Sequence, residues 1–281
     1  MALVYVHGGV SGTPKLKPSL AAAFEGHGGS AVDLVEIAVM ALEDHPGLNA
    51  GYGAVLNEQG LLELDAGIAD GATGAAGGVA NIGARHPISV ARAVMERTPH
   101  VLLTGAGAQA FAASFEQLDG TTPERVQRYV QARDAGELGP GSFGSPSSVD
   151  TVGAVALDDQ GRLAAGSSTG GVFGKMAGRV GDAPIFGAGF YASMSAAVVG
   201  TGLGEVFLET LAALRVGALI EDGTHPQDAC ELLVRHLSKR DRYAATGLLA
   251  LDAEGNIGVA FRGAMLAVEG YDGPIDISPL A

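Results

Sequence analysis

The chain of 281 residues is 47% hydrophobic, enough to bury one sizeable core or at most two modest ones. Its net charge of −14 argues against binding to nucleic acid or to anionic lipid, and its 17% of charged residues excludes a disordered acidic chain. The 44 glycines follow no Gly-X-Y period, which excludes collagen and indicates tight turns and close approach of the backbone to a ligand.

Cysteine usage and the N-terminal segment favour a cytoplasmic location. Cys230 is the only cysteine, so no disulfide within the chain is possible, and residues 1–7 lack the basic and apolar regions of a signal peptide. The uncharged segment 183–204 is long enough to span a bilayer. It contains Pro184 and five glycines, however, so a buried loop and strand of a soluble protein is favoured over a membrane span.

Hydrophobic periodicity predicts helices at five places in chain order. They cover residues 31–43, 89–97, 122–133, 205–221 and 227–240, the last opened by Pro226 in its first turn. Three further stretches have the hairpin pattern of an apolar run, a polar turn and a second apolar run. These are 54–64, 155–164 and 249–259, and their turns are closed by Gly60, Gly161 and Gly255. Hairpins mixed with helices predict an α+β layered fold with antiparallel sheets.

The segment 134–150 interrupts these patterns. It is rich in glycine, proline and serine and has little apolar periodicity, so it is either a flexible linker or an ordinary surface loop. Composition alone favours the surface loop.

Two short motifs suggest functions that their context does not support. The G-x-G-x-x-A pattern at 105–110 lacks the later acidic strand end of a dinucleotide site, so it indicates a helix start lined by small residues. The G-x-S-x-G pattern at 166–170 would make Ser168 a nucleophile, with Asp222 and either His225 or His236 as partners. A nucleophile elbow needs a helix directly after the serine, and the glycines that follow prevent one. The seven histidines show no close pair typical of a zinc site.

Thr151 occupies a position with two possible meanings. It lies where the segment 134–150 ends and an apolar strand begins, and threonine is common in strands for purely structural reasons. If the Asp150–Thr151 bond were cut, however, Thr151 would carry a hydroxyl nucleophile and an α-amine base on one residue. An α-amine has a pKa of about 7.7–8.0, which suits a base near neutral pH.

Together, an ordered set of motifs resembles the plant-type asparaginase and isoaspartyl-peptidase family of N-terminal-nucleophile hydrolases. The set is HGG at 7–9, LNAGYG at 48–53, DTVGAVALD at 150–158, STGG at 168–171, GRVGD at 178–182, GAGFYA at 187–192 and TGLGE at 201–205. The resemblance implies a four-layer αββα fold made as one domain of residues 1–281. It also implies self-cleavage before Thr151 into an α subunit (1–150, ending in the linker 134–150) and a β subunit (151–281), paired as a homodimer of cleaved units.

The resemblance further implies the roles of individual residues. Thr151 is the nucleophile in cleavage and in turnover, Thr169 orients its hydroxyl, and Asn49 lies close on the other side. Thr201 and the N–H of Gly202 contact the substrate and form an oxyanion hole, a type of site that contributes about 3–4 kcal/mol.

Two charged residues would then bind the substrate's amino-acid head. By the resemblance, Arg179 clamps the α-carboxylate and Asp182 holds the α-ammonium, each with the donor or acceptor geometry that its partner needs. On spacing alone, an ion pair between Arg179 and Asp182 would be favoured.

Catalysis in this family needs no cofactor, but the resemblance implies a structural sodium ion bound by backbone carbonyls. The residues in the corresponding loop are Leu42, Glu43, His45, Leu48, Ala50 and Tyr52. Without the family, Glu43 and His45 are simply a helix end.

The expected function is therefore hydrolysis of L-asparagine and β-aspartyl dipeptides to release aspartate. The STGG and TGLGE motifs depart from the glycosylasparaginase pattern and favour the cytoplasmic β-aspartyl-dipeptide branch. Two alternatives remain: an uncleaved protein that binds amino acids or dipeptides without turnover, and a serine hydrolase that uses Ser168.

Overall fold

The computed structural model describes residues 2–9, 29–139, 150–237, 239, 245–263, 268–270, 273–275 and 278–280. Its helices are α2 (Ala31–Glu43), the 3-10 helix η1 (Gly51–Gly53), α3 (Pro87–Arg97), α4 (Gly105–Ala112), α5 (Pro123–Asp134), α6 (Gly204–Thr210), α7 (Ala212–Glu221) and α8 (Pro226–Leu237). Its strands are β1 (Leu3–His7), β2 (Leu64–Asp70), β3 (Ala75–Ile82), β4 (Leu102–Thr104), β5 (Val152–Leu157), β6 (Leu163–Thr169), β7 (Phe190–Ala192), β8 (Ala196–Gly202), β9 (Thr246–Asp252), β10 (Ile257–Arg262), β11 (Val268–Gly270) and β12 (Gly273–Pro274).

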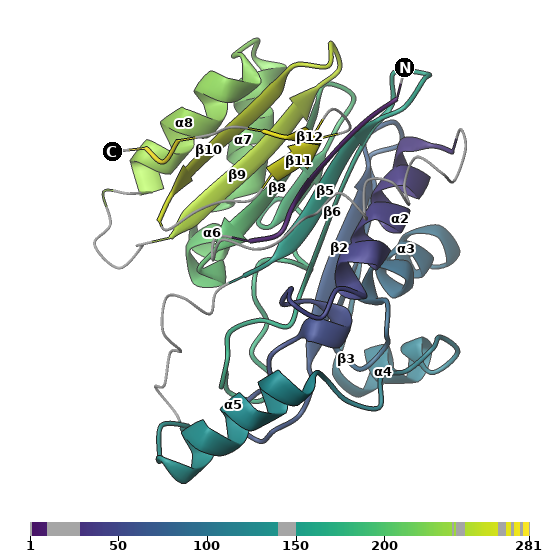
Figure 1. Ribbon diagram of the computed structural model, residues 1–281. Coiled ribbons are helices and arrows are strands. Elements are labelled where there is room, and N and C mark those ends of the chain that lie inside the picture. The colour runs from purple at the N-terminus through teal and green to yellow at the C-terminus, as the bar shows by residue number, and fades with distance from the viewer. Residues whose placement is uncertain are drawn as a thin grey trace.

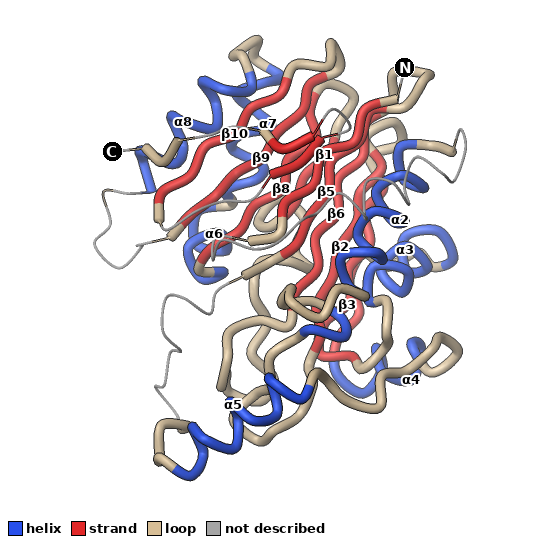
Figure 2. The backbone as a smooth tube through the Cα atoms, in the orientation of Figure 1, coloured by secondary structure: helices blue, strands red, loops and turns tan. Residues whose placement is uncertain are grey.

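These strands form two sheets that pack face to face. Across the described ranges, the larger sheet has the order β12-β11-β1-β5-β6-β2-β3-β4 and the smaller one the order β10-β9-β8-β7. Neighbouring strands run antiparallel, except that β3 and β4 are parallel. Helices α2 and α3 cover the outer face of the larger sheet, and α7 and α8 cover that of the smaller sheet (Figures 1 and 2). The four-layer αββα prediction is therefore confirmed.

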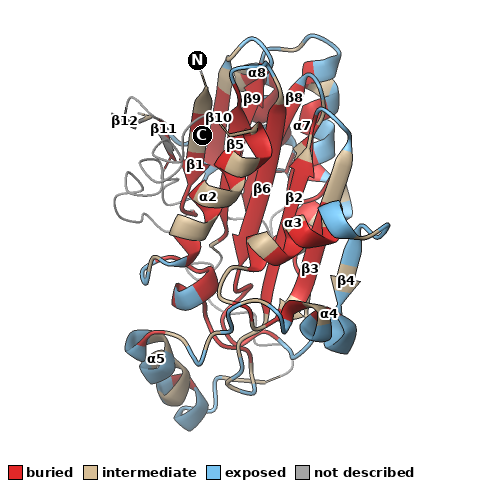
Figure 3. Ribbon diagram, turned by 90° about the vertical axis from the view of Figure 1, so that its right-hand side faces the viewer, coloured by how far each residue is buried: buried red, intermediate tan, exposed pale blue. Residues whose placement is uncertain are grey.

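Three apolar layers hold the four structural layers together. Val35 and Val90 belong to the layer between the first helices and the larger sheet, Val155 to the layer between the sheets, and Val216 and Leu233 to the layer under the second helix pair. Figure 3 shows β2, β5 and β6 of the larger sheet almost entirely buried, the short strand β4 partly exposed, and α2 and α3 buried only on the sides that face the sheet. Because both faces of each sheet are covered, the strands are nearly continuous apolar runs.

The predicted helices agree with the structure, with one correction. Helix α2 begins at a capping box in which Ser30 and Asp33 bond reciprocally, and Thr122 caps α5. The single helix predicted over 205–221 is wrong, because Leu211 adopts a left-handed conformation with φ 49° and separates α6 from α7. Helix α7 is bound to the loop before β7, since the N–H groups of Ala213 and Leu214 donate to the carbonyls of residues 188 and 187. Helix α8 ends at Leu237 and Lys239 lies in a turn, so the predicted end of the helix at 240 is too late; residues 238 and 240 lie outside the described residues.

The three predicted glycine turns form, but only two of them join paired strands. At each turn an Asn or Asp side chain accepts two backbone N–H bonds, and the glycine has a positive φ. The turns at Gly161 and Gly255 join β5 to β6 and β9 to β10. The hairpin predicted at 54–64 is wrong, because Val55 and Leu56 bond to Asn49 and to Gly174 instead of to a partner strand.

The motif at 105–110, the uncharged segment 183–204 and the predicted linker complete the comparison with the local predictions. The motif at 105–110 begins helix α4, as predicted. The uncharged segment 183–204 contains β7 and β8, and no helix in the described residues is long and apolar enough to cross a membrane. Of the segment predicted as a linker, residues 140–149 lie outside the described residues, and residue 134 is the last residue of α5.

Candidate active site

Thr151 lies directly before β5, on an edge of the sandwich that it shares with the ends of β6 and β8. The residue is 4% exposed, and all six residues of β5 after it are buried, which fixes its position. Its backbone N–H donates to Oγ1 of Thr201 at 3.3 Å. The structure therefore brings together two residues that are 50 positions apart and that the sequence placed in one site.

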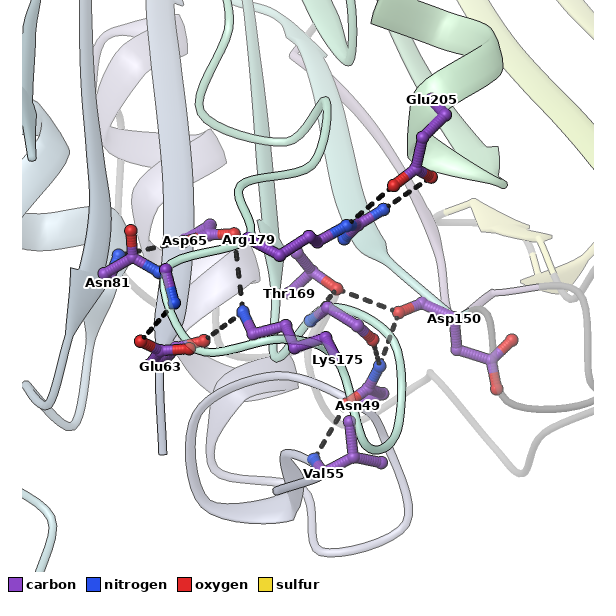
Figure 4. Close-up of polar contacts among 12 residues, drawn as sticks. Asn49, Val55, Glu63, Asp65, Asn81, Asp150, Thr169, Lys175, Arg179 and Glu205 are labelled. Atoms are coloured by element: carbon purple, nitrogen blue, oxygen red, sulfur yellow. Dashed lines mark hydrogen bonds and ion pairs between the residues drawn. The ribbon is translucent and has the colours of Figure 1, made fainter. Parts of the chain in front are cut away.

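The carbonyl oxygen of Asp150, which belongs to the Asp150–Thr151 peptide bond, accepts two hydrogen bonds. Nδ2 of Asn49 and Oγ1 of Thr169 each donate to it at 3.0 Å, and Figure 4 shows both side chains pointing at this oxygen. A carbonyl oxygen that already holds two donors is prepared for the negative charge of a tetrahedral intermediate. Sequence reasoning placed Asn49 and Thr169 near Thr151 but did not foresee that they share this acceptor.

Both donors are themselves held in place by the chain segment after β6. The second N–H of Asn49 donates to the carbonyl of Gly171 at 2.7 Å, and Oδ1 of Asn49 accepts the N–H of Val55 at 2.9 Å. The N–H of Gly171 donates to Oγ1 of Thr169 at 3.0 Å. Thr169 therefore accepts from Gly171, which directs its own hydroxyl proton to Asp150.

The predicted oxyanion pair lies at the end of β8. Gly202 has φ 141°, and a Cβ atom there would lie 2.6 Å from the carbonyl oxygen of Ala245, so the position needs glycine. Thr201 is buried, and its hydroxyl oxygen accepts the backbone N–H of Thr151.

His7 and Gly9 of the HGG motif lie beside the Asp150–Thr151 peptide bond. A Cβ atom on Gly9, whose φ is 98°, would lie 2.5 Å from Oδ1 of Asp150, so this glycine allows the Asp150 side chain to approach. Burial lowers the pKa of His7 to about 3, against a smaller opposing effect of the Thr151 backbone. His7 is therefore neutral near pH 7 and too weakly basic to activate Thr151.

Arg179 and Asp182 lie near each other, but they do not form the local ion pair that their spacing favours. Arg179 instead makes a two-pronged bond with Glu205, Nε to Oε1 at 2.9 Å and Nη2 to Oε2 at 2.8 Å (Figure 4). A Cβ atom on Gly204 would lie 2.8 Å from Oδ1 of Asp182 and 3.0 Å from Nη2 of Arg179. The two side chains therefore converge on a position that only a glycine leaves open.

Asp182 is a buried carboxyl group with one oxygen that could still accept a hydrogen bond from a cation. It is buried, and its Oδ2 has no hydrogen-bond partner among the described residues. Burial raises its pKa to about 7, against the opposing charge of Arg179. An ammonium group bound here would lower that pKa and supply the missing partner.

Sequence reasoning missed three charged residues beside this site. Glu205 is the last residue of the TGLGE motif, and the sequence did not indicate that it is the partner of Arg179. Lys175 and Asp65 are buried, with Nζ and Oδ2 3.8 Å apart. The only available signal was that Lys175 is one of four lysines in the chain and sits in a glycine-rich, otherwise apolar stretch.

Ser168 does not have the environment of a nucleophile. It lies within strand β6, and its Oγ donates to Oε1 of Glu43 at 2.6 Å. His86 contacts the other oxygen of Glu43 at 3.3 Å, so the carboxylate stands between the serine and this histidine. Asp222 and His236, two of the predicted partners, line a groove between α7 and α8 in a different layer. Within the described ranges, no elbow or triad forms at Ser168.

The loop predicted to bind sodium gathers backbone carbonyls around Gly53. A Cβ atom on Gly53 would lie 2.1 Å from the oxygen of Leu48, 2.7 Å from that of Pro46 and 2.8 Å from that of His45. Such a donor set suits a hard cation. The carbonyls of Leu42, His45, Ala50 and Tyr52 accept hydrogen bonds within the protein, and the Glu43 side chain bonds to Ser168. The described residues contain no group of three His, Cys, Asp or Glu side chains that could hold a metal.

Comparison with known proteins identifies the family of this chain. The model of a family described as asparaginase matches residues 17–273. An isoaspartyl peptidase of Salmonella typhimurium is 46% identical over 88% of this chain and 82% of its own length. A plant-type L-asparaginase of Thermococcus kodakarensis is 42% identical over 92% of this chain and 93% of its own. An isoaspartyl peptidase/L-asparaginase of Rattus norvegicus is 39% identical, covering 90% of this chain and 81% of its own.

Proposed function

This chain belongs to the asparaginase family, and from that premise we propose that it hydrolyses L-asparagine and β-aspartyl dipeptides with Thr151 as an N-terminal nucleophile. The observation that carries the proposal is the Asp150 carbonyl, which accepts bonds from Asn49 and Thr169 directly before a buried threonine. The relatives are named as enzymes, which favours catalysis over the alternative of a protein that only binds amino acids.

The first step is activation of the chain. Oγ1 of Thr151 attacks the carbonyl carbon of Asp150, and the two donors stabilise the oxyanion that forms. The C–N bond then breaks, the nitrogen takes up a proton, and an ester links Asp150 to the Thr151 oxygen. Water hydrolyses the ester, which leaves a carboxylate on Asp150 and a free α-amine on Thr151.

The second step is turnover. The α-amine accepts the hydroxyl proton, directly or through water, as Oγ1 attacks the side-chain amide carbon of the substrate. The hydroxyl of Thr201 and the N–H of Gly202 stabilise the oxyanion, and ammonia or an amino acid leaves with a proton. Water then hydrolyses the β-aspartyl ester and releases aspartate.

The charged residues supply recognition of the amino-acid head. Asp182 meets the α-ammonium, since it is a buried carboxylate whose Oδ2 lacks a hydrogen-bond partner among the described residues. Arg179 meets the α-carboxylate, and Glu205 occupies two of its donors, Nε and Nη2, which fixes the plane of the guanidinium. Substrates that lack either charge are expected to bind poorly.

The intact mass of purified protein tests the mechanism. We expect two fragments, with N-terminal sequencing of the second beginning at Thr151, and release of aspartate from β-aspartyl dipeptides. The Thr151→Ala variant should remain at 28.2 kDa and be inactive, whereas Ser168→Ala should still cleave and turn over. A full-length chain that is active, or an active Thr151→Ala variant, would overturn the proposal.

Three further features belong to the proposal. We place the enzyme in the cytoplasm, which the single cysteine, Cys230, supports.

We expect a homodimer of cleaved units, and native mass spectrometry tests this. We also assign sodium to the carbonyls near Gly53, and exchange of sodium for lithium should alter the thermal unfolding midpoint.

A further inference from the structure

Lys175 is a buried cation beneath the candidate active site. Its side chain is 2% exposed, and its Nζ donates to the carbonyl of Glu63 at 2.8 Å and lies 3.8 Å from Oδ2 of Asp65 (Figure 4). Burial lowers the pKa of Lys175 and raises that of Asp65, so each group resists ionisation except in the presence of the other.

This ion pair is a poor device for stability alone. The distance of 3.8 Å is too long for a hydrogen bond, and Oδ2 of Asp65 has no hydrogen-bond partner among the described residues. Desolvation of two buried charges commonly exceeds the attraction between them, and an apolar pair of similar volume is often as stable. The contacts of the Lys175 ammonium group therefore indicate its function better than the stability of the ion pair does.

The ammonium group lies against Gly171. A Cβ atom at Gly171, whose φ is 79°, would lie 2.9 Å from Nζ and 2.9 Å from Cδ of Lys175. Both peptide groups of Gly171 serve the active site: its N–H donates to Thr169 and its carbonyl accepts from Asn49. Any shift of Gly171 therefore moves both donors of the Asp150 carbonyl.

The other end of this arrangement is a rigid strand. Asp65 lies opposite Thr169 in the β2–β6 pairing, and its Oδ1 accepts the N–H of Asn81. The bond from Nζ to Glu63 reaches the residue directly before β2. Lys175 thus spans from the start of strand β2 to Gly171, which bonds to both Asn49 and Thr169.

We propose that Lys175, with Asp65 as its counter-ion, is a positioning residue that holds Gly171 so that Asn49 and Thr169 both point at the Asp150 carbonyl. The inference rests on the proposed function of Thr151. It predicts an effect on self-cleavage, which involves no substrate, and on kcat. The effect on KM should be smaller, because Lys175 makes no hydrogen bond or ion pair with Arg179 or Asp182 among the described residues and acts on Arg179 only through its charge.

The test is the rate of self-cleavage of the Lys175→Met variant. Chains made by cell-free synthesis are quenched in denaturant over time, and the fragments are separated by gel. We expect cleavage and kcat to slow roughly 10- to 100-fold, since small misplacements of reacting groups have effects of this size, while KM stays within about threefold. The matched control is Lys239→Met, which removes an exposed lysine and should behave as the wild type.

A second variant separates positioning from folding. Lys175→Met leaves Asp65 as an uncompensated buried charge, whereas Lys175→Met/Asp65→Asn removes both charges and should fold. We expect the double variant to melt cooperatively and still to cleave slowly. Cleavage of either folded variant at the wild-type rate would overturn the inference, as would a change confined to KM. Failure of the wild type to cleave before Thr151 would instead overturn the proposed function.

Discussion

At the scale of single residues, the chemistry of this protein depends on where buried polar groups find partners. The Asp150 carbonyl has two donors, Arg179 is held by Glu205, and Asp182 keeps one oxygen without a hydrogen-bond partner among the described residues. Buried polar atoms without partners are rare in native proteins because their desolvation is not compensated. We therefore expect the substrate to complete the set at Asp182, as the proposed function requires.

Removal of the Thr169 hydroxyl should slow self-cleavage. Thr169→Val keeps the shape of the side chain but loses the donor to the Asp150 carbonyl, and loss of one oxyanion donor typically costs about 10²–10³-fold in rate. The rate can be measured by the same quenched time course. Thr98→Val is a suitable control, because it removes a hydroxyl that donates to a helix carbonyl at the end of α3. Equal rates for Thr169→Val and the wild type would contradict the assigned role.

Asp182 should make the folded state less stable as the pH increases. Its pKa rises from 3.8 in the unfolded chain to about 7 in the folded one, so the folded state holds a proton that the unfolded state releases between these values. The contribution of this group to the free energy of unfolding therefore falls by about 1.4 kcal/mol per pH unit across that window. Thr151→Ala/Asp182→Asn should gain stability over Thr151→Ala as the pH rises.

Urea unfolding from about pH 4 to about pH 8 measures this difference, with both variants uncleaved. The gain should grow up to pH 7 and then stay constant. Asp222→Asn, an exposed aspartate at the end of α7, provides the control in the same background. A gain that is independent of pH would show that Asp182 titrates normally.

At the scale of elements, local sequence patterns predicted the turns and most helices well. Tertiary contacts decided whether the segments beside a turn pair and where a helix ends. All three glycine turns have the same Asx geometry, yet the segments on the two sides of Gly60 do not form a strand pair with each other. Likewise, the apolar periodicity of 205–221 continues across a residue that breaks the helix.

Leu211→Gly should stabilise the protein. The left-handed conformation costs a residue with a side chain about 1–2 kcal/mol, whereas glycine adopts it freely, at the expense of a more flexible unfolded state. Leu211 is 44% exposed, so little burial is lost. We expect a net gain of up to about 1 kcal/mol, measured by denaturant unfolding. Leu214→Gly, within α7, should instead destabilise by about 1 kcal/mol, and the same sign for both variants would contradict the explanation.

At the scale of the whole molecule, the proposed cleavage point divides the sequence but not the fold. Strand β1 lies between β5 and β11, and β2 pairs with β6, so the two sides of the Asp150–Thr151 bond are interleaved in one sheet. Figure 1 shows the purple N-terminal strand within the teal and yellow strands of the other part. The core beneath α2 likewise includes residues from both parts.

The two fragments should therefore remain associated after cleavage. Size-exclusion chromatography of cleaved protein should give one peak at the volume of the uncleaved Thr151→Ala variant, and denaturing gels should show two bands. Urea sufficient to unfold the chain should be needed to separate the fragments. Elution of the fragments apart in plain buffer would contradict a single folding unit of residues 1–281.

The sequence by itself determined where the helices lie, apart from the break at Leu211, and also the glycine turns, the order of the family motifs and the position of Thr151. The helices and turns depend on the conformational preferences of a few neighbouring residues. The family motifs are short sequence patterns that can be identified without knowing how the chain packs. Asn49 and Thr169 could thus be assigned to the site as members of motifs.

Only the tertiary structure decided how those residues act together. Asn49 and Thr169 are 101 and 19 residues from Asp150, and their common acceptor exists only once η1, β6 and β5 are packed. The partner of Arg179 is Glu205 and not the nearby Asp182, and Lys175 reaches across to β2. Partners of buried charges are selected by long-range packing and desolvation, which no local pattern encodes.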